Sequence, residues 1–313
     1  MSKYLIVDSS FLAYRSYFAF GNLTNKKNQP TGAIFGYAKT IFQLVNKLAP
    51  EYLIICKDLQ TPTFRHEALK EYKGNRKPME DNMQSQMQLI EDFSNLITKN
   101  NFSLEGYEAD DIIYSVVNKY SNDSNEFYIL SGDKDLFQLF TFDRVSFVKE
   151  EKDFVTIFRS EEFVTKYSLQ PVQWVDYKAL VGDGSDNFAG VPGIGPVSAL
   201  KILHGCGCLH TLIEALKMDS KPFNPYSISN NVQEYINNPK NEALVTKIKE
   251  NYEVLKLSYM LSKLALCDYS ANPLEDSFTF EKSLPMLEEL DMHGLVKYYH
   301  TNFGIKLIQE ELF

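Results

Sequence analysis

Three short apolar runs, each followed closely by an aspartate, constrain the fold of this chain most strongly. They are Tyr4–Asp8 (YLIVD), Tyr52–Asp58 (YLIICKD) and Phe127–Asp133 (FYILSGD). Their length and their aliphatic and aromatic content are typical of buried strands, and helical periodicity over Ala33–Leu48 separates the first two. Strands that alternate with helices predict an α/β fold with a parallel, doubly wound central sheet.

The aspartates at the ends of these runs give the first indication of a site. In a doubly wound sheet the carboxyl ends of the strands border one crevice, where ligands bind. Asp8, Asp58 and Asp133 would therefore converge. A single aspartate after a strand is more often a cap or turn residue. Three in one predicted sheet indicate a shared site.

Three short clusters, EADD, GDKD and GDGSD, add further carboxylates. Glu108 and Asp111 are three residues apart, so we expect them on one helix face, and Asp183 and Asp186 repeat this spacing. The full set is Asp8, Asp58, Glu108, Asp110, Asp111, Asp133, Asp135, Asp183 and Asp186. Nine carboxylates in one crevice would repel each other and destabilise the fold unless cations neutralise them.

Ligands that are all oxygen select a hard cation, Mg²⁺ or Mn²⁺, or Ca²⁺ if the cage is larger. Two such ions can activate a water and stabilise the leaving oxygen of a phosphodiester. The net charge of −9 argues at first against a nucleic-acid partner. However, removing the nine carboxylates from the 41 Asp+Glu leaves 32, equal to the 32 Lys+Arg, so the net charge does not exclude a polyanionic substrate.

The stretch GVPGIGPVSAL, directly after GDGSDNFA, is a second candidate element. Its glycines let backbone N–H groups approach a phosphate, and we expect a helix to begin at about Pro196. Elsewhere, four irregularly spaced cysteines do not form a disulfide framework and no segment approaches membrane-spanning length. We therefore expect a cytoplasmic protein without a membrane partner.

Taken in order, these motifs resemble the flap endonuclease superfamily, in particular the 5′-nuclease domain of bacterial DNA polymerase I and the stand-alone phage and bacterial flap endonucleases. The resemblance covers nearly the whole chain: IVDSSFLAYRSYFAF, PTGAIFGY, KD followed by TFR, EYKGNR, GYEADDI, LSGDKDLFQL and GDGSDNFAGVPGIG. It implies a PIN-like α/β nuclease domain over 1–158 with a helical arch at about 62–100. A helical DNA-binding domain would follow over 159–313, with a helix-three-turn-helix at about 182–204.

The resemblance also implies an activity and a role for each motif. The chain would be a structure-specific 5′-nuclease, either a flap endonuclease or a 5′-3′ exonuclease, acting in replication and repair, including the removal of primer flaps. Its partner would be branched or nicked duplex DNA with a 5′ single strand, bound by a monomer. One ion would be held by Asp8, Asp58, Glu108 and Asp110. The other would be held chiefly by Asp133, Asp135, Asp183 and Asp186, with Asp111 bridging or behind them.

Further residues are implied to contact DNA. Tyr72 would stack on a base, and Lys73 and Arg76 would contact the scissile phosphate, the alternative being a solvated helix face. Other implied DNA contacts are Arg15, Arg65, Gly190, Val191, Gly193, Gly195, Ser198 and Lys201, with a K⁺ ion at the hairpin. The family usually has a G-x-K pattern after the second glycine turn, but here Pro196–Ser198 follows Gly195. That phosphate contact is therefore either absent or supplied by Lys201.

Two rival functions remain at this point. A DNA-binding scaffold with little turnover fits the missing hairpin lysine, whereas a phosphatase on a related sheet would leave the glycine-rich hairpin unexplained. The stretch HGCGCLH fits a helix that ends in a glycine cap at Gly205 better than a zinc site. The C-terminal pattern Gln309, Leu312 and Phe313 resembles sliding-clamp peptides, and the alternative is an amphipathic helix packed on the domain.

Overall fold

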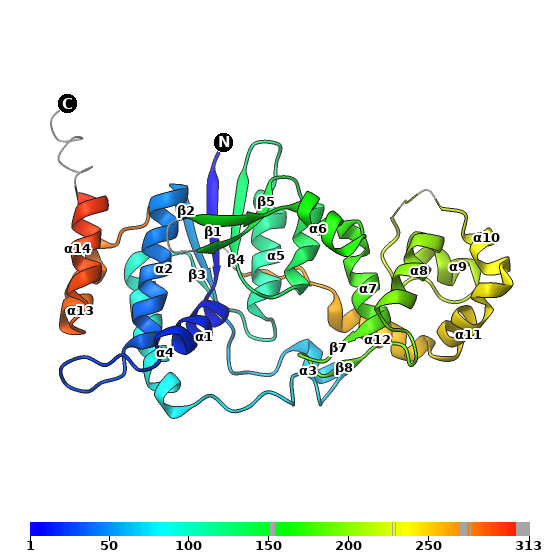
Figure 1. The fold of residues 1–313 in the computed structure, drawn as a ribbon, viewed down its shortest axis with the longest axis horizontal. Helices are drawn as coiled ribbons and strands as arrows, with labels where there is room; N and C mark the ends of the chain where they lie inside the picture. Colours follow the sequence, from blue (N-terminus) through cyan, green and yellow to red (C-terminus); the bar gives the residue numbers. More distant parts are fainter. Residues whose placement is uncertain (151–153, 227, 229, 270–273, 276, 305–313) are drawn as a thin grey trace.

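The computed structural model describes residues 1–150, 154–226, 228, 230–269, 274–275 and 277–304. The expected clamp-binding residues, Gln309, Leu312 and Phe313, lie outside this range. A six-stranded sheet forms the centre, in the order β3-β2-β1-β4-β5-β6 (Figure 1). Its strands are β1 (Lys3–Asp8), β2 (Tyr52–Cys56), β3 (Asn101–Phe102), β4 (Glu126–Leu130), β5 (Val145–Glu150) and β6 (Val155–Phe158). Neighbouring strands pair in parallel except for β5 and β6.

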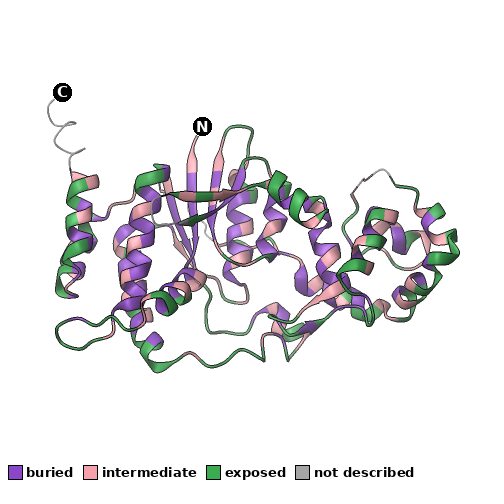
Figure 2. Cartoon of the chain, viewed as in Figure 1, coloured by how far each residue is buried: buried purple, intermediate pink, exposed green. Residues whose placement is uncertain are grey.

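Helices cover both faces of the sheet because alternate residues of each buried strand point to opposite sides. Leu5 and Val7 of β1 belong to the core beneath α2, whereas Ile6 belongs to the core beneath α5. Buried residues fill the central sheet and the helices beside it (Figure 2). The helices of this part are α1 (Ser9–Phe20), α2 (Gly32–Leu48), α3 (Phe64–Ala68), α4 (Asp81–Ile97) and α5 (Ala109–Tyr120), followed by the 3₁₀ helix η1 (Asp135–Thr141). The predicted doubly wound sheet is confirmed.

Helices dominate the second half of the chain. They are α6 (Ser160–Tyr167), η2 (Pro171–Gln173), α7 (Trp174–Val181), α8 (Pro196–Cys206), α9 (Leu209–Ala215), α10 (Val232–Asn237), η3 (Pro239–Asn241), α11 (Glu242–Glu250) and α12 (Tyr252–Ser262). A two-stranded ribbon, β7 (Gly182–Asp183) with β8 (Phe188–Ala189), lies between α7 and α8. One continuous apolar core joins α7 and α8 to the α5 face of the sheet.

The chain then returns to the first half of the molecule. It ends its described part with η4 (Glu281–Ser283), α13 (Leu284–Glu289) and α14 (His293–Asn302). These helices pack against α2 and α4, at the opposite end of the molecule from α8–α11 (Figure 1). The second half is therefore not one helical lobe throughout, as the expected domain over 159–313 implied. Within the described residues, no helix is long and apolar enough to cross a membrane.

The segment expected to be a helical arch is only partly helical. Residues 69–80 form turns and an extended chain between α3 and α4 (Figure 1). Lys73 has a φ of 54° in the left-handed region, which an α-helix does not allow, and Pro78 lacks the N–H that a helix interior needs. The segment is instead tied to the β7–β8 loop, because the backbone N–H of Lys73 donates to the carbonyl oxygen of Asp186 at 2.9 Å.

Candidate active site

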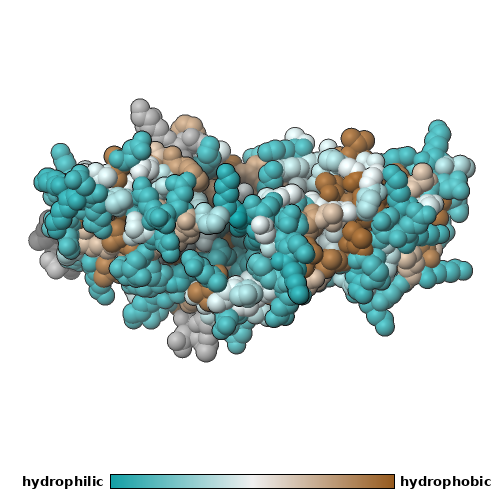
Figure 3. All heavy atoms as spheres, turned by 90° about the horizontal axis from the view of Figure 1, so that it is seen from below, coloured by the Kyte–Doolittle hydropathy of each residue, from teal (hydrophilic) through white to brown (hydrophobic). Residues whose placement is uncertain are grey.

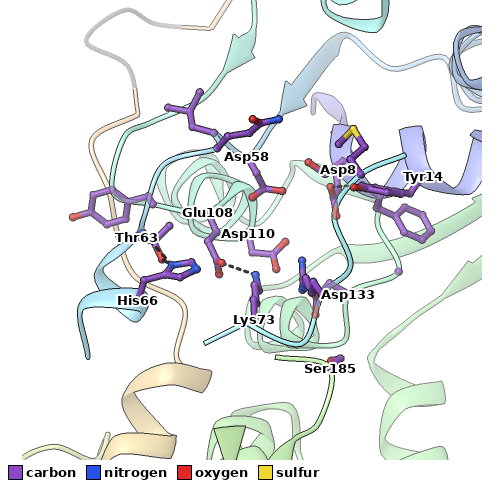
Figure 4. A pocket seen from close by; sticks show the side chains of 18 of the residues that line it. Asp8, Tyr14, Asp58, Thr63, His66, Lys73, Glu108, Asp110, Asp133 and Ser185 are labelled. Carbon is purple, nitrogen blue, oxygen red and sulfur yellow. Dashed lines mark hydrogen bonds and ion pairs between the residues drawn. The ribbon is translucent and has the colours of Figure 1, made fainter. Parts of the chain in front are cut away.

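A cavity of about 670 Å³ opens beyond the carboxyl ends of β1, β2 and β4. Six of the predicted carboxylates line it: Asp8, Asp58, Glu108, Asp110, Asp133 and Asp183. Several of them point toward one another from different elements (Figure 4). Seen from below, hydrophilic side chains border the hollow at the centre of this face (Figure 3). The predicted convergence of strand-end aspartates is therefore confirmed.

Backbone and hydroxyl groups orient the carboxylates of this cavity. Asp8 ends β1 and caps α1, where its Oδ1 accepts from the N–H of Phe11 at 2.9 Å and its Oδ2 accepts from Ser131 Oγ at 2.7 Å. Asp58 Oδ1 accepts from the N–H of Ala109 at 2.8 Å, at the N-terminus of α5. The helix termini thus hold these carboxylates in the cavity.

Asp8, Asp58, Asp110 and Asp133 share one property, and we call them the open carboxylates. No described lysine or arginine forms an ion pair with any of them. Burial, reinforced by the charge of Asp58, raises the pKa of Asp8 to about 7. Burial and the neighbouring Asp133 also raise the pKa of Asp110 well above its usual range. Their oxygen atoms are the donors that a hard divalent cation prefers.

Asp135, Asp183 and Asp186 differ, and we call them the paired carboxylates. Lys178 of α7 forms ion pairs with Asp135 Oδ1, at 2.7 Å, and with Asp183. Arg76 Nη2 lies 2.8 Å from Asp186 Oδ1. Burial opposes the ionisation of Asp183, but hydrogen bonds from Lys178 and Ser185 prevail and lower its pKa to about 2. Asp135 is buried enough that its pKa is raised to about 7 in spite of Lys178.

Asp183 and Asp186 repeat the spacing of Glu108 and Asp111 but do not lie on a helix. Helix α7 ends at Val181 because Gly182 has a φ of 80°, and Asp183 lies in the β7–β8 ribbon. A side chain at Gly182 would also meet the backbone nitrogen of Gly190 at 2.2 Å. This turn brings Asp183 back beside Lys178, which the spacing of the two aspartates did not indicate.

Asp111 faces away from the cavity. It occupies the first turn of α5, where its Oδ1 and Oδ2 accept from Arg65 Nη2 and Nη1 at 2.9 and 2.7 Å. Arg65 is 2% exposed and also donates to Glu108 and to the carbonyl oxygens of Leu261 and Lys263. The expected phosphate contact by Arg65 is therefore wrong for this structure, since its guanidinium joins α3, α5, the last turn of α12 and the residue after it.

The other predicted arch residues lie at the edge of the cavity. Lys73 Nζ is 2.5 Å from Glu108 Oε1, and both side chains line the cavity (Figure 4). Tyr72 is 2% exposed, and its hydroxyl donates to Glu108 and to Asp186. The Tyr72 ring is covered by its neighbours in this conformation, so stacking on a base would require the segment 69–80 to move.

The described residues do not contain a preformed metal cage. Across that part of the chain, no group of three His, Cys, Asp or Glu side chains surrounds a common point as metal ligands. The same holds for the HGCGCLH stretch, where α8 continues to Cys206 and ends at Gly207, with a φ of 82°, instead of at Gly205. Cys208 caps α9, accepting from the N–H of Thr211 at 3.4 Å. These thiols have structural roles.

The glycine loop forms the predicted turn before a helix. Helix α8 begins at Pro196, as expected, and Gly193 has a φ of 74°. Gly190 is required because a Cβ there would lie 2.3 Å from the carbonyl oxygen of Leu180. Among the other expected DNA contacts, Val191 is buried, Arg15 and Ser198 are half-buried, and Gly193, Gly195 and Lys201 are exposed.

Two lysines near these elements were not predicted. Lys247 of α11 donates from Nζ to the carbonyl oxygen of Gly193 at 2.9 Å, so a lysine does reach the glycine loop, although not from α8. Lys201 Nζ instead donates to the carbonyl oxygen of Lys240 at 3.3 Å. Lys178 was not predicted either. Neither Lys247 nor Lys178 has a local sequence signal, because each is recognised only through a partner that the fold brings near.

Comparison with known proteins places this geometry in a family. The model of the 5′-3′ exonuclease N-terminal resolvase-like domain matches residues 3–168, and that of the 5′-3′ exonuclease C-terminal SAM fold matches residues 169–281. The chain belongs to the 5′-3′ exonuclease family. A 5′-3′ exonuclease of Buchnera aphidicola subsp. Schizaphis graminum is 34% identical over 300 residues, covering 95% of this chain and 96% of the relative. Membership in this family confirms the resemblance that the sequence motifs indicated.

Two further relatives extend the comparison. DNA polymerase I of Thermus aquaticus is 38% identical over 314 residues, which are 98% of this chain and 34% of that protein. The chain thus spans about a third of the length of such polymerase relatives. The flap endonuclease of bacteriophage T5, solved as a pseudo-enzyme-product complex with DNA and metal ions, shares the fold with a TM-score of 0.59. It is 22% identical, over 84% of this chain and 89% of that chain.

Proposed function

We propose that this 5′-3′ exonuclease family member hydrolyses DNA phosphodiesters at flaps, nicks and 5′ ends, with divalent metal ions held by the carboxylates of the cavity. The observation that carries the proposal is the set of open carboxylates. Asp8 is buried and Asp110 is half-buried, and neither has an ion-pair partner among the described residues, so their anionic forms are disfavoured and their pKa values are raised. Divalent cations would remove this repulsion.

The open carboxylates are assigned to a first ion and the paired carboxylates to a second. When bound, Mg²⁺ or Mn²⁺ would supply an activated water and a Lewis acid at the scissile phosphate. Glu108 lies next to the first set and is held by Lys73. Asp111 is not assigned as a ligand, because Arg65 occupies both of its oxygens. Its role is to fix the first turn of α5, from which Glu108 and Asp110 reach the cavity.

The basic residues of segment 69–80 are assigned to the substrate. Lys73 and Arg76 line the cavity. Without a substrate, Lys73 forms an ion pair with Glu108, and Arg76 forms one with Asp186. A phosphodiester that enters would offer these side chains new anionic partners. Transfer of Lys73 and Arg76 to the phosphate would stabilise the charge that develops on its oxygens during hydrolysis. The Lys73–Glu108 pair is largely buried, and charges interact more strongly in such an environment than in water.

The glycine loop and the start of α8 are assigned to the duplex beyond the cut. The backbone N–H groups of Gly193 and Gly195 would approach a phosphate, and the N-terminus of α8 adds a favourable dipole. Val197 stands at the place of the usual lysine and is 82% exposed. From the sequence, this phosphate contact was either absent or supplied by Lys201. Lys247 reaches the loop and is assigned the contact instead.

The test is cleavage of a 5′-labelled flap duplex by the full chain in Mg²⁺, with EDTA as the metal-free condition. We expect short labelled products in Mg²⁺ and none in EDTA. Asp110→Asn should abolish the products while duplex binding, measured by fluorescence anisotropy, is retained. A protein that binds the flap but gives no product in Mg²⁺ or Mn²⁺ would instead be a DNA-binding scaffold, and the proposal would be wrong.

A further inference from the structure

Lys178 is a buried lysine with an unusual position. It is 8% exposed and lies between two of the paired carboxylates, Asp135 and Asp183, with ion pairs to both. Asp183 lines the cavity directly. The ammonium of Lys178 therefore places a positive charge where the proposed second ion would bind. A buried lysine that remains charged needs such partners, since burial alone favours its neutral form.

The backbone around Lys178 fixes this arrangement. Trp174, one turn earlier on α7, donates from Nε1 to the carbonyl oxygen of Lys134 at 2.7 Å and so anchors α7 beside the start of η1, where Asp135 lies. Gly182 ends α7 and returns Asp183 to the same point. Lys178 thus contacts one carboxylate through packing between elements and the other through a local turn. Neither contact depends on a flexible surface side chain.

We propose that Lys178 is the resident counter-ion of the paired carboxylates and that it makes the second metal position weaker than the first. This inference rests on the proposed function, because it assumes that divalent ions bind in the cavity. An arriving ion finds four carboxylates without an ion-pair partner at the first position, but at the second it must share Asp135 and Asp183 with an ammonium. Lys178 is a positioning residue, since it acts through these carboxylates and does not contact the substrate.

The arrangement has a functional consequence. With Lys178 in place, Asp135 and Asp183 have a cationic partner without a metal ion, and the second ion gains less from binding to the free protein. Phosphate oxygens of a bound substrate would add the missing negative charge. The second ion would therefore bind mainly together with substrate, which limits cleavage to complexes in which the DNA strand already occupies the cavity.

The test is Mn²⁺ binding to the full chain without DNA, measured by isothermal titration calorimetry and by the electron paramagnetic resonance signal of free Mn²⁺. We expect the wild type to bind one ion tightly and a second at least about tenfold more weakly. Lys178→Met should tighten the second step by about tenfold or more, the effect expected from removing a unit positive charge within ion-pair distance. Lys178→Arg should retain the weak second step.

Lys166→Met is the matched control, because it removes an exposed lysine that lies over the Phe158 and Tyr167 rings, outside the cavity. It should leave both binding steps unchanged. The double variant Lys178→Met with Asp183→Asn removes one charge of each sign. It replaces Lys178→Met in the binding experiment if that single variant does not fold. It should fold and should lack the tightened second step.

The outcomes separate the two proposals. A folded Lys178→Met protein whose second step is unchanged or weaker overturns the role of Lys178, and so does a tightened second step in Lys178→Arg. Absence of Mn²⁺ binding in the wild type overturns the proposed function itself. Two equally tight steps in the wild type overturn only the role of Lys178.

Discussion

The open and paired carboxylates lie in one cleft but have opposite electrostatic surroundings. Asp8 lacks an ion-pair partner among the described residues, and burial raises its pKa to about 7. Asp183 accepts from Lys178 and Ser185, and its pKa falls to about 2. The charge of Asp8 is therefore disfavoured in this cleft, whereas the charge of Asp183 is stabilised. The charged and hydrogen-bonding neighbours of each aspartate, more than the residue type, therefore decide where this cleft requires a cation.

The largest expected effects come from two single substitutions, one in the open carboxylates and one in the paired carboxylates. Asp110→Asn should lower the cleavage rate of a flap duplex in Mg²⁺ by on the order of 10³-fold or more, a loss typical of removing a main electrostatic element of a site. Asp183→Asn should lower it by less, because Asp135 and Asp186 remain at the second position. Single-turnover kinetics measure both. Equal losses in two folded variants would contradict the distinction between the two sets.

Breaking the buried ion pair between Arg65 and Asp111 should lower the free energy of unfolding more than breaking the pair of Arg76. Arg65→Met leaves Asp111 buried without a cation, and breaking a buried ion pair of this kind typically destabilises a protein by about 3–5 kcal/mol. Arg76→Met removes a partly exposed guanidinium, whose side chain is 55% exposed, and should change stability by less than about 1 kcal/mol. Urea unfolding of both variants gives the comparison, and a small effect of Arg65→Met would show that Asp111 is solvated.

The pH dependence of the metal-free protein should differ in sign between the carboxylates. Asp8 and Asp135 have raised folded pKa values of about 7, so their contribution to stability is present below pH 4 and is lost as the pH rises toward 7. Asp183 has a lowered pKa of about 2, so its contribution is present above pH 4 and is lost as the pH falls toward 2.

Thermal unfolding in EDTA from pH 2 to 8 measures this dependence. We expect the melting temperature to fall between about pH 4 and 7, and Mg²⁺ to restore it at pH 8. Asp8→Asn should flatten the fall without moving the acid limb. A melting temperature that rises steadily up to pH 8 in EDTA would contradict the raised pKa values.

The smallest expected effect concerns the glycine loop, which lies outside both carboxylate sets. Lys247→Ala should weaken binding to a nicked duplex about threefold to tenfold and lower the slope of log K against log salt by about one, as expected for one lost phosphate contact. Lys201→Ala is the matched control and should have less effect. Reversed effects would assign the contact to Lys201.

Restoring the usual lysine offers the converse experiment. Val197 is exposed at the start of α8, so Val197→Lys should fit without repacking and should tighten duplex binding a few-fold at low salt. Fluorescence anisotropy with the same nicked duplex measures the change. An unaltered affinity would mean that no phosphate passes this end of α8, and that the hairpin is placed differently on DNA.

The sheet and most of the cleft could be predicted from the sequence because their signals are local. Apolar runs of strand length fix β1, β2 and β4, and parallel pairing then brings Asp8, Asp58 and Asp133 to one edge. Neither step needs knowledge of a distant partner. The start of α8 at Pro196 was predicted for the same reason, since proline is favourable in the first helical turn.

The remaining features depend on contacts between distant residues. A basic residue beside aromatic ones looks like a DNA contact, and only the fold shows that Arg65 meets Asp111, 46 residues away. The turns of segment 69–80 arise from the left-handed conformation of Lys73, which its neighbours do not signal. Lys178 and Lys247 were missed because each acquires its role from a partner that the fold brings near.

The central claim, that the open carboxylates hold a divalent ion and the paired carboxylates hold a weaker one, is tested most directly by crystallography with Mn²⁺. Anomalous difference maps from crystals soaked at increasing Mn²⁺ concentration locate each ion without relying on activity. The account predicts a first peak among Asp8, Asp58, Asp110 and Asp133, and a second peak near Asp135 and Asp183 only at higher concentration. A first peak at the paired carboxylates, or none in the cleft at saturating Mn²⁺, would contradict it.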